Sequence, residues 1–305
     1  NDGAGNFGAQ QVISTAAVGA RAVYAADLDG DGDMDVLSIS NFIIEWYEND
    51  GAGNFGVQQI INVTVNGAGS VYAGDIDGDG QLDVVVVQDK RHPDGGSIWV
   101  WNPRTGDIIA SANAGLTGGI AFIGDVQGDC KPEIGMTFEK ELRMYQFDGS
   151  PQLKLLYSLP TTDKSGYTGI TMFDFNQDGK QELVYRDETN LRILEGATGK
   201  TLVSYPMKSR TAMEYPVVAD VDGDGRAEIL VNGYQSSNPY DHRVYCFESG
   251  GAPWAPARSV WNQYGYHVTN VNDDLTIPRY PQNPATPLPG YKTCLQPTCP
   301  APYNA

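Results

Sequence analysis

The sequence predicts an all-β fold made of repeated units, and three features of the 305-residue chain indicate it. A nine-residue acidic loop occurs five times, and the first residues of successive loops lie 48, 50, 49 and 46 positions apart. Short runs of β-branched and apolar residues stand before and after each loop, which is typical of strands. No segment has the periodicity of an amphipathic helix. A regular period of this length indicates an array, a solenoid or a propeller.

Each repeat contains four short strand-like runs. The first precedes the acidic loop, and these runs cover residues 22–26, 71–74, 120–124, 170–173 and 216–219. The second follows the loop directly. The third runs cover residues 43–47, 98–101, 142–145, 191–194 and 243–247. A Gly-rich turn then leads to a fourth run, as at 57–61 and 201–205. Four strands per repeat describe one blade of a β-propeller, with a stack of hairpins as the alternative.

The acidic loops share Asp at positions 1 and 5 and an acid at position 9. Oxygen ligands in this pattern suit a hard cation, and Ca²⁺ takes about six to eight of them, including carbonyls and water. We expect ligands from the side chains at positions 1, 3, 5 and 9, the last through both oxygens, and from the carbonyl at position 7. The expected metal-site residues are Asp27, Asp29, Asp31, Asp33 and Asp35; Asp75, Asp77, Asp79, Gln81 and Asp83; Asp125, Gln127, Asp129, Lys131 and Glu133; Asp174, Asn176, Asp178, Lys180 and Glu182; and Asp220, Asp222, Asp224, Arg226 and Glu228.

The spacing distinguishes these loops from an EF-hand, whose last acid lies further along the chain and on a helix. Asp-Gly pairs that merely make turns are the alternative, but five copies with their acids in register argue against it. The third loop departs most, with Gln127 at position 3 and Cys130 in place of glycine, while the fourth has Asn176 and Gln177. We therefore expect up to five Ca²⁺ ions, with the weakest site, or none, at loop 125–133.

The two ends of the chain differ from the repeats. Residues 1–13 match 49–61 at all but two positions, so residues 1–14 are interpreted as the third turn and fourth strand of an incomplete blade. That strand either completes another blade of the ring or follows earlier blades of a longer protein, and the second reading is favoured. Residues 15–250 form the five blades. Residues 251–305 are rich in Pro and aromatic residues, and are expected to pack on the propeller as an irregular segment leading to another module.

The formal net charge of −18 argues against nucleic-acid binding, which needs clustered Lys and Arg. Five bound Ca²⁺ ions would bring it to −8, so the acidity is interpreted as mostly a property of the metal sites. No apolar run is long enough to span a membrane. Calcium sites of this type favour a secreted or cell-surface location. Cys294 and Cys299 are close enough in sequence to form a disulfide.

These residues also carry a resemblance to a known family. Phe-Gly at 7–8 and 55–56, with Asp-x-Asp-Gly-Asp-Gly-x-x-Asp at 27–35 and 75–83, resembles the FG-GAP (or VCBS-type) repeat. The resemblance implies a calcium-binding β-propeller like the seven-bladed head of α-integrins. The number of blades does not carry over, since five loops are visible, and about seven blades are expected in the complete ring. The stretches 254–264 and 271–278 resemble the segment after such propellers in bacterial surface proteins exported by type IX secretion.

Three functions are compatible with the sequence. The first is an adhesion module that binds a surface glycan or protein. The third-strand aromatics Trp46, Tyr47, Trp99, Trp101 and Tyr145 would stack on sugars, although such residues more often fill the space between blades. The second is a polysaccharide lyase, because some lyases of this class are propellers that carry similar loops. The third is a structural spacer or assembly subunit.

An enzyme is not expected, since no familiar catalytic motif is present. A lyase would need a base, and the only histidines are His92, His242 and His267, each more typical of a surface position.

Ligand number predicts the rank of the sites. Asp79→Ala should lower the melting temperature in calcium by more than Asp129→Ala, because the second loop has the fuller set of carboxylates. Differential scanning calorimetry of both variants in excess CaCl₂ measures the difference. Equal shifts would show that ligand count does not rank these sites.

Overall fold

The chain is all-β in its computed structural model, and the part that the structure describes contains no helix. Its strands form four four-stranded sheets and one three-stranded sheet. The structure describes residues 9–40, 43–62, 65, 67–88, 96–116, 118–129, 131–210, 215–235, 238, 243–261 and 271–276.

The strands follow the chain in order within each sheet, and every neighbouring pair is antiparallel. The first sheet contains β1 (Ala20–Ala26), β2 (Asp35–Ser40), β3 (Ile43–Tyr47) and β4 (Gln59–Asn62). The second contains β5 (Ala68–Gly74), β6 (Asp83–Gln88), β7 (Ser97–Trp101) and β8 (Ile108–Asn113). The third contains β9 (Gly118–Gly124), β10 (Glu133–Phe138), β11 (Glu141–Gln146) and β12 (Lys154–Pro160). The fourth contains β13 (Ile170–Phe173), β14 (Glu182–Arg186), β15 (Asn190–Glu195) and β16 (Thr201–Pro206). The fifth contains β17 (Val217–Ala219), β18 (Glu228–Gly233) and β19 (Arg243–Phe247).

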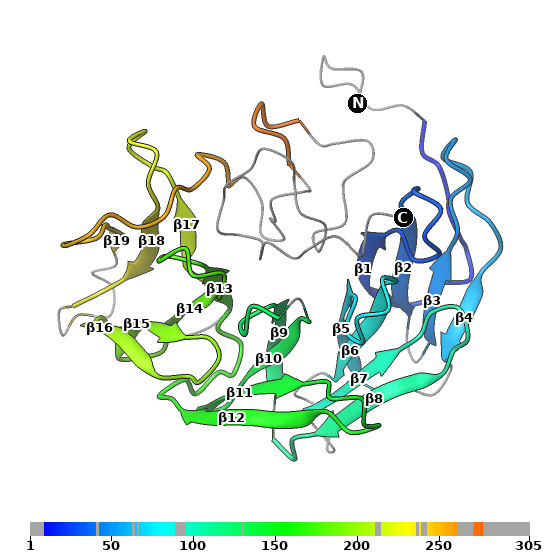
Figure 1. Ribbon diagram of the computed structural model, residues 1–305. Coiled ribbons are helices and arrows are strands. Elements are labelled where there is room, and N and C mark those ends of the chain that lie inside the picture. The colour runs from blue at the N-terminus through cyan, green and yellow to red at the C-terminus, as the bar shows by residue number, and fades with distance from the viewer. Residues whose placement is uncertain are drawn as a thin grey trace.

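This arrangement confirms the all-β fold of repeated four-stranded blades. Figure 1 shows the five sheets following one another round an arc, with the first strand of each sheet nearest the centre and the last strand outermost. Neighbouring sheets meet through their inner strands, because β1 contacts β5, β5 contacts β9, and β13 contacts β17. Closure of the arc into a ring of about seven blades stays a prediction.

The hydrophobic core lies between the sheets. Four clusters of buried side chains are present among the described residues, and each joins two consecutive sheets. β6, β10 and β14 are buried at every residue, because each second strand has neighbours on both faces. The outer strand β16, by contrast, is exposed along its whole length.

The third-strand aromatics belong to this core. Trp46 and Trp101 are 2% and 3% exposed and pack in the cluster between the first two sheets, where Trp99 is partly buried. Tyr145 packs in the next cluster, and Tyr47 is also buried. Trp46, Trp99, Trp101 and Tyr145 fill the space between blades and Tyr47 is buried, so the suggestion that these aromatics are sugar platforms is not supported.

Two segments near the ends of the described chain are hydrogen-bonded to the repeats. Gln11 donates a side-chain hydrogen bond to the carbonyl of Gly53 at 2.6 Å. Residues 251–261 lie between the fourth and fifth sheets, since Ala255 N–H donates to Phe175 O and Ala227 N–H donates to Ala255 O, both at 3.0 Å. The assignments of 1–14, 15–250 and 251–305 as separate parts stay predictions, and residues 1–8 lie outside the described residues.

One glycine tests how tightly a blade is packed. A Cβ at Gly135 in β10 would lie 1.9 Å from the ring of Phe122, which belongs to the cluster between the third and fourth sheets. Gly135→Ala should destabilise the protein by about 1–3 kcal/mol, because the ring has to move within a packed core. Urea unfolding measures this change. Gly250→Ala, where nothing lies within 4 Å, is the control. An equal effect of the two changes would contradict the prediction.

Candidate metal centres

Each acidic loop joins the first strand of a sheet to the second. The acid at position 9 is the first residue of β2, β6, β10, β14 or β18, so every loop ends at the start of a buried strand. One oxygen of this acid accepts the backbone N–H of position 2 in all five loops. The pairs are Leu28–Asp35 at 2.9 Å, Ile76–Asp83 at 3.0 Å, Val126–Glu133 and Phe175–Glu182 at 2.9 Å, and Val221–Glu228 at 2.7 Å.

The Asp at position 1 holds the turn in shape. In the first loop, Asp27 accepts the N–H groups of Gly30 at 2.7 Å and Gly32 at 3.1 Å. Asp75 does the same for Gly78 and Gly80, at 2.8 and 3.1 Å. The glycines at positions 4 and 6 have positive φ values, near +80° at position 4, which lets the backbone curl around these oxygens.

Three loops gather carboxylates that fit a hard cation. In each, the acids at positions 1, 3 and 9 have ligand atoms within 4.8 Å of one another. Converging carboxylate oxygens at this spacing are the donors that Ca²⁺ prefers. The groups are Asp27, Asp29 and Asp35; Asp75, Asp77 and Asp83; and Asp220, Asp222 and Glu228.

The acids at position 5 stand apart from these groups. Asp31, Asp79 and Asp224 each accept the N–H of position 7 through Oδ1, at 2.7–2.9 Å. The position 7 residues Asp33, Gln81 and Arg226 thereby use their N–H groups in the turn, and their proposed role through the carbonyl stays a prediction.

The third and fourth loops are built differently. The Gln127 carboxamide donates to Glu133 Oε1 at 2.7 Å, and the Asn176 carboxamide donates to Glu182 Oε1 at 3.2 Å. An amide N–H therefore satisfies the acid where the other loops gather a third carboxylate. A cation in these loops would need the carboxamide to turn its oxygen inward. This agrees in direction with the weaker site expected at loop 125–133.

Burial raises the pKa of the position 9 acids, and neighbouring carboxylates add to the effect. The pKa of Asp83 rises to about 8 and that of Asp35 to about 6. Glu133 and Glu182 rise to about 7 for the same leading cause, although hydrogen bonds from Gln127 and from the Phe175 N–H oppose the shift. Carboxylates brought together in this way repel one another until a proton or a cation is bound.

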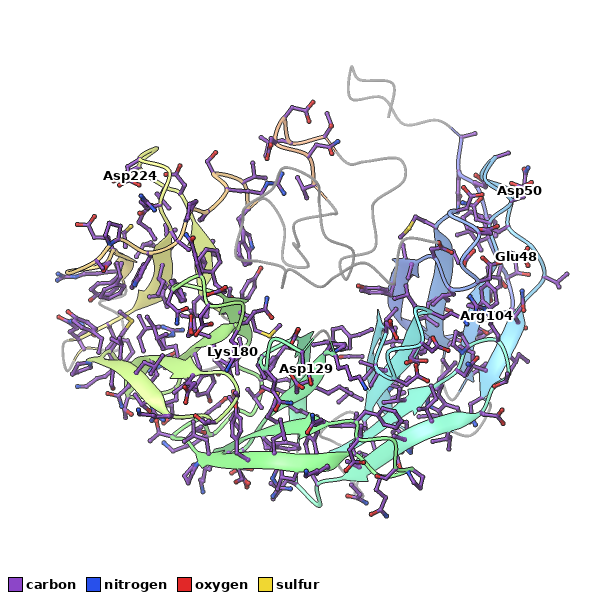
Figure 2. The ribbon with its side chains drawn as sticks, in the orientation of Figure 1. Glu48, Asp50, Arg104, Asp129, Lys180 and Asp224 are labelled. Atoms are coloured by element: carbon purple, nitrogen blue, oxygen red, sulfur yellow. The ribbon has the colours of Figure 1, made fainter. Side chains whose placement is uncertain are left out.

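Basic side chains from neighbouring elements lie against the loops, which sequence reasoning missed. Burial raises the pKa of Asp77, and the charge of Lys131 in the next loop opposes that shift. A Cβ at Gly128 would lie 3.2 Å from Cγ of Lys180, and one at Gly30 would lie 3.2 Å from Nη2 of Arg104. Figure 2 shows Lys180 beside Asp129. The sequence does contain a sign of these basic neighbours, because position 7 is Lys in two successive loops.

The remaining candidates lie mostly outside the described residues. These include His92, His242 and His267, the possible bases of a lyase, and Cys130, Cys294 and Cys299. Cys246 is described, and it is a free and exposed thiol. Among the described residues, no helix is long and apolar enough to cross a bilayer.

The raised pKa values predict the pH dependence of the metal-free protein. The pKa of Asp83 is about 8 in the folded state and near its ordinary value of 3.8 in the unfolded state. The stability that its bound proton contributes is therefore complete below pH 3.8 and is lost as the pH rises to about 8. In EDTA, the melting temperature should fall as pH rises from about 4 to 8. In excess CaCl₂ the fall should vanish or reverse, because the ion keeps the carboxylates ionised. A scanning fluorimetry series over pH tests this, and the same falling slope with and without calcium would contradict it.

The chain was also compared with known proteins. The model of the FG-GAP-like repeat matches residues 1–38, 40–86 and 174–231. The curated proteins contain no match. Among solved structures, a lectin from Agrocybe aegerita that specifically recognises non-reducing terminal N-acetylglucosamine is 15% identical, with a TM-score of 0.51 over 81% of this chain and 69% of the lectin.

Two rhamnogalacturonan lyases are similar to the same degree. YesW is 16% identical with a TM-score of 0.52, and the lyase of Bacillus licheniformis is 17% identical with a TM-score of 0.51. Both alignments cover 74% of this chain, which spans only 49% and 48% of the two lyases. At such identities the likeness concerns the fold. The chain therefore carries FG-GAP-like repeats on an all-β fold of repeated four-stranded antiparallel sheets.

Proposed function

We propose that this chain is a calcium-stabilised extracellular β-propeller that serves as an adhesion module and binds a glycan or protein ligand. The observation that carries the calcium assignment is the gathering of three acids within 4.8 Å in each of three repeated loops. Sites of this kind in extracellular modules bind Ca²⁺ with dissociation constants of about 10⁻⁴–10⁻³ M, which suits a secreted or cell-surface protein.

Calcium would act as a fastener within each blade. Position 1 follows the first strand and position 9 begins the second, so one ion contacting both ties the two strands together at the loop. Asp75 and Asp83 would supply such a pair of ligands, since both are nearly fully buried and both belong to the same acidic group. An ion that binds only the folded state stabilises it by about 2.7 kcal/mol when its concentration is 100 times the dissociation constant.

The ligand-binding role is supported by the solved structures of similar fold. They include a lectin and two lyases of a polysaccharide, so this architecture occurs in proteins that recognise or act on carbohydrates. Resemblance of 254–264 to the segment after such propellers in surface proteins also supports export, by type IX secretion, as part of a longer multidomain chain.

A polysaccharide lyase is the second candidate, favoured by the two rhamnogalacturonan lyases. Incubation with pectin fragments would produce unsaturated products that absorb in the ultraviolet. Such a signal would make the chain an enzyme. A spacer or assembly subunit would share the calcium sites and lack a ligand.

Removing one ligand charge should separate calcium stabilisation from general charge effects. Asp77→Asn removes a carboxylate of the second group, and Asp107→Asn makes the same change in an exposed turn between β7 and β8. Asp77→Asn should lower the number of bound Ca²⁺ ions by one and reduce the rise in melting temperature on adding calcium. Isothermal titration calorimetry and calorimetric melting measure both effects. Identical behaviour of the two variants would contradict the calcium assignment.

The binding role predicts hits on a broad glycan array in CaCl₂, which EDTA should weaken because the blades loosen. Matched arrays of the same preparation with and without EDTA provide the measurement. An array with no glycan hit would remove the carbohydrate part of the proposal and leave a protein ligand or a spacer.

A further inference from the structure

A hollow of about 480 Å³ lies beside the fourth acidic loop, and its size is that of a small-molecule site. Three elements form its walls: the loop itself, strands β15 and β16 of the fourth sheet, and residues 252–255 between the fourth and fifth sheets. It is separate from the buried aromatics of the third strands. Its lining includes Asn176, Gln177, Leu202, Val203, Pro253 and Trp254.

The apolar wall is formed in advance. The Trp254 ring rests on Phe175, with centroids 4.8 Å apart and planes tilted by 59°. The backbone bond from Ala255 N–H to Phe175 O holds the same segment against the loop. A wall that is ordered before binding loses little conformational entropy when a ligand arrives.

The opposite wall comes from β16. Its Leu202 and Val203 are 47% and 51% exposed. Ile193 pairs with Val203 while Leu194 pairs with Thr201, so Leu202 is the extra residue of a β-bulge, a feature that also recurs in the other four-stranded sheets. A bulge redirects side chains, which lets two consecutive residues border one hollow.

Gln177 is the unusual residue of this site. Position 4 is glycine in the other four loops, with φ between +73° and +82°, whereas here Gln177 adopts φ of +62°. A residue with a Cβ is strained in this left-handed region. Strain of this kind concentrates at functional sites, and here it places a carboxamide at the border of an apolar hollow.

We propose that this hollow binds a neutral sugar ring, a proposal that rests on the carbohydrate-binding role above and locates its site. Aromatic and aliphatic walls suit the apolar face of a pyranose, and the carboxamide of Gln177 both donates and accepts hydrogen bonds, as sugar hydroxyls require. The Asn176 carboxamide, which borders the hollow as well, supplies a second group of this kind.

Charge decides between neutral and acidic sugars. Glu182 borders the hollow, and Asp174 and Asp178 belong to the same loop. A uronate or sulfated sugar would add a further negative charge beside Glu182, so the site selects uncharged rings.

The test uses the full chain in CaCl₂ on an array of neutral hexose and N-acetylhexosamine oligosaccharides, oligogalacturonates and sulfated glycans. The strongest hit is then titrated by calorimetry against Gln177→Gly, which restores the residue of the other loops, and Leu202→Ser. We expect a neutral glycan to bind, and each change to weaken binding by at least about fivefold, since about 1 kcal/mol is lost with each contact.

Two control variants make the same kinds of change outside the hollow. Lys140→Gly relaxes a similar positive φ of 64° in the turn between β10 and β11, and Val244→Ser removes an apolar side chain that is 75% exposed on β19. Both should bind as the unaltered protein does. Gln177→Gly should keep or raise the melting temperature, which excludes unfolding as the cause of weaker binding.

Each other outcome decides against the proposal. A neutral glycan that Gln177→Gly and Leu202→Ser bind equally well overturns the site and leaves the carbohydrate-binding role intact. Binding to acidic glycans alone overturns the selection for neutral rings. No binding to any glycan overturns the site and the carbohydrate-binding role together.

Discussion

The carboxylate that begins each second strand is the constraint on which the rest of the structure depends. It accepts the N–H of loop position 2 in all five repeats, and so joins the turn to the second strand of each sheet. In three loops two further acids converge on it. Burial and mutual repulsion make that arrangement costly without a counter-charge, as the pKa of about 8 at Asp83 shows. A divalent cation could relieve that cost in these three loops, where no described side-chain amide meets the acid.

The repeats are alike in backbone and different in chemistry. Gln127 and Asn176 supply N–H donors to the acid, so the third and fourth loops satisfy it from within the chain. Lys131 and Lys180, in the same two loops, bring positive charge towards the preceding loop. Internal donors and neighbouring cations thus offset part of the carboxylate charge. One array combines turns whose acids converge with turns whose acid meets a side-chain amide, and its hollow beside Gln177 lies at one of the latter.

Much of the fold and of the candidate centres follows from pattern alone. The apolar run before each loop and the acid in register after it predict β1 and β2, and their counterparts, because a period-two backbone and a fixed turn leave little freedom. Other features needed coordinates. Trp46 packs in the cluster between two sheets and Trp254 rests on Phe175, and both contacts join residues far apart in sequence. The direction of the Gln127 carboxamide follows from its bond to Glu133 within the folded loop.

The sequence by itself determined the strand order, the loop positions and the acids that can serve as ligands, since these depend on local spacing and on the chemistry of single side chains. Only the tertiary structure decided which acids converge, which carboxylates meet an amide instead, and where a hollow forms. The physical reason is that desolvation and contact are set by neighbouring sheets. Asp83 and Gln177 show the two cases: one is ordinary in sequence and costly when buried, the other is unusual only once its backbone angle is known.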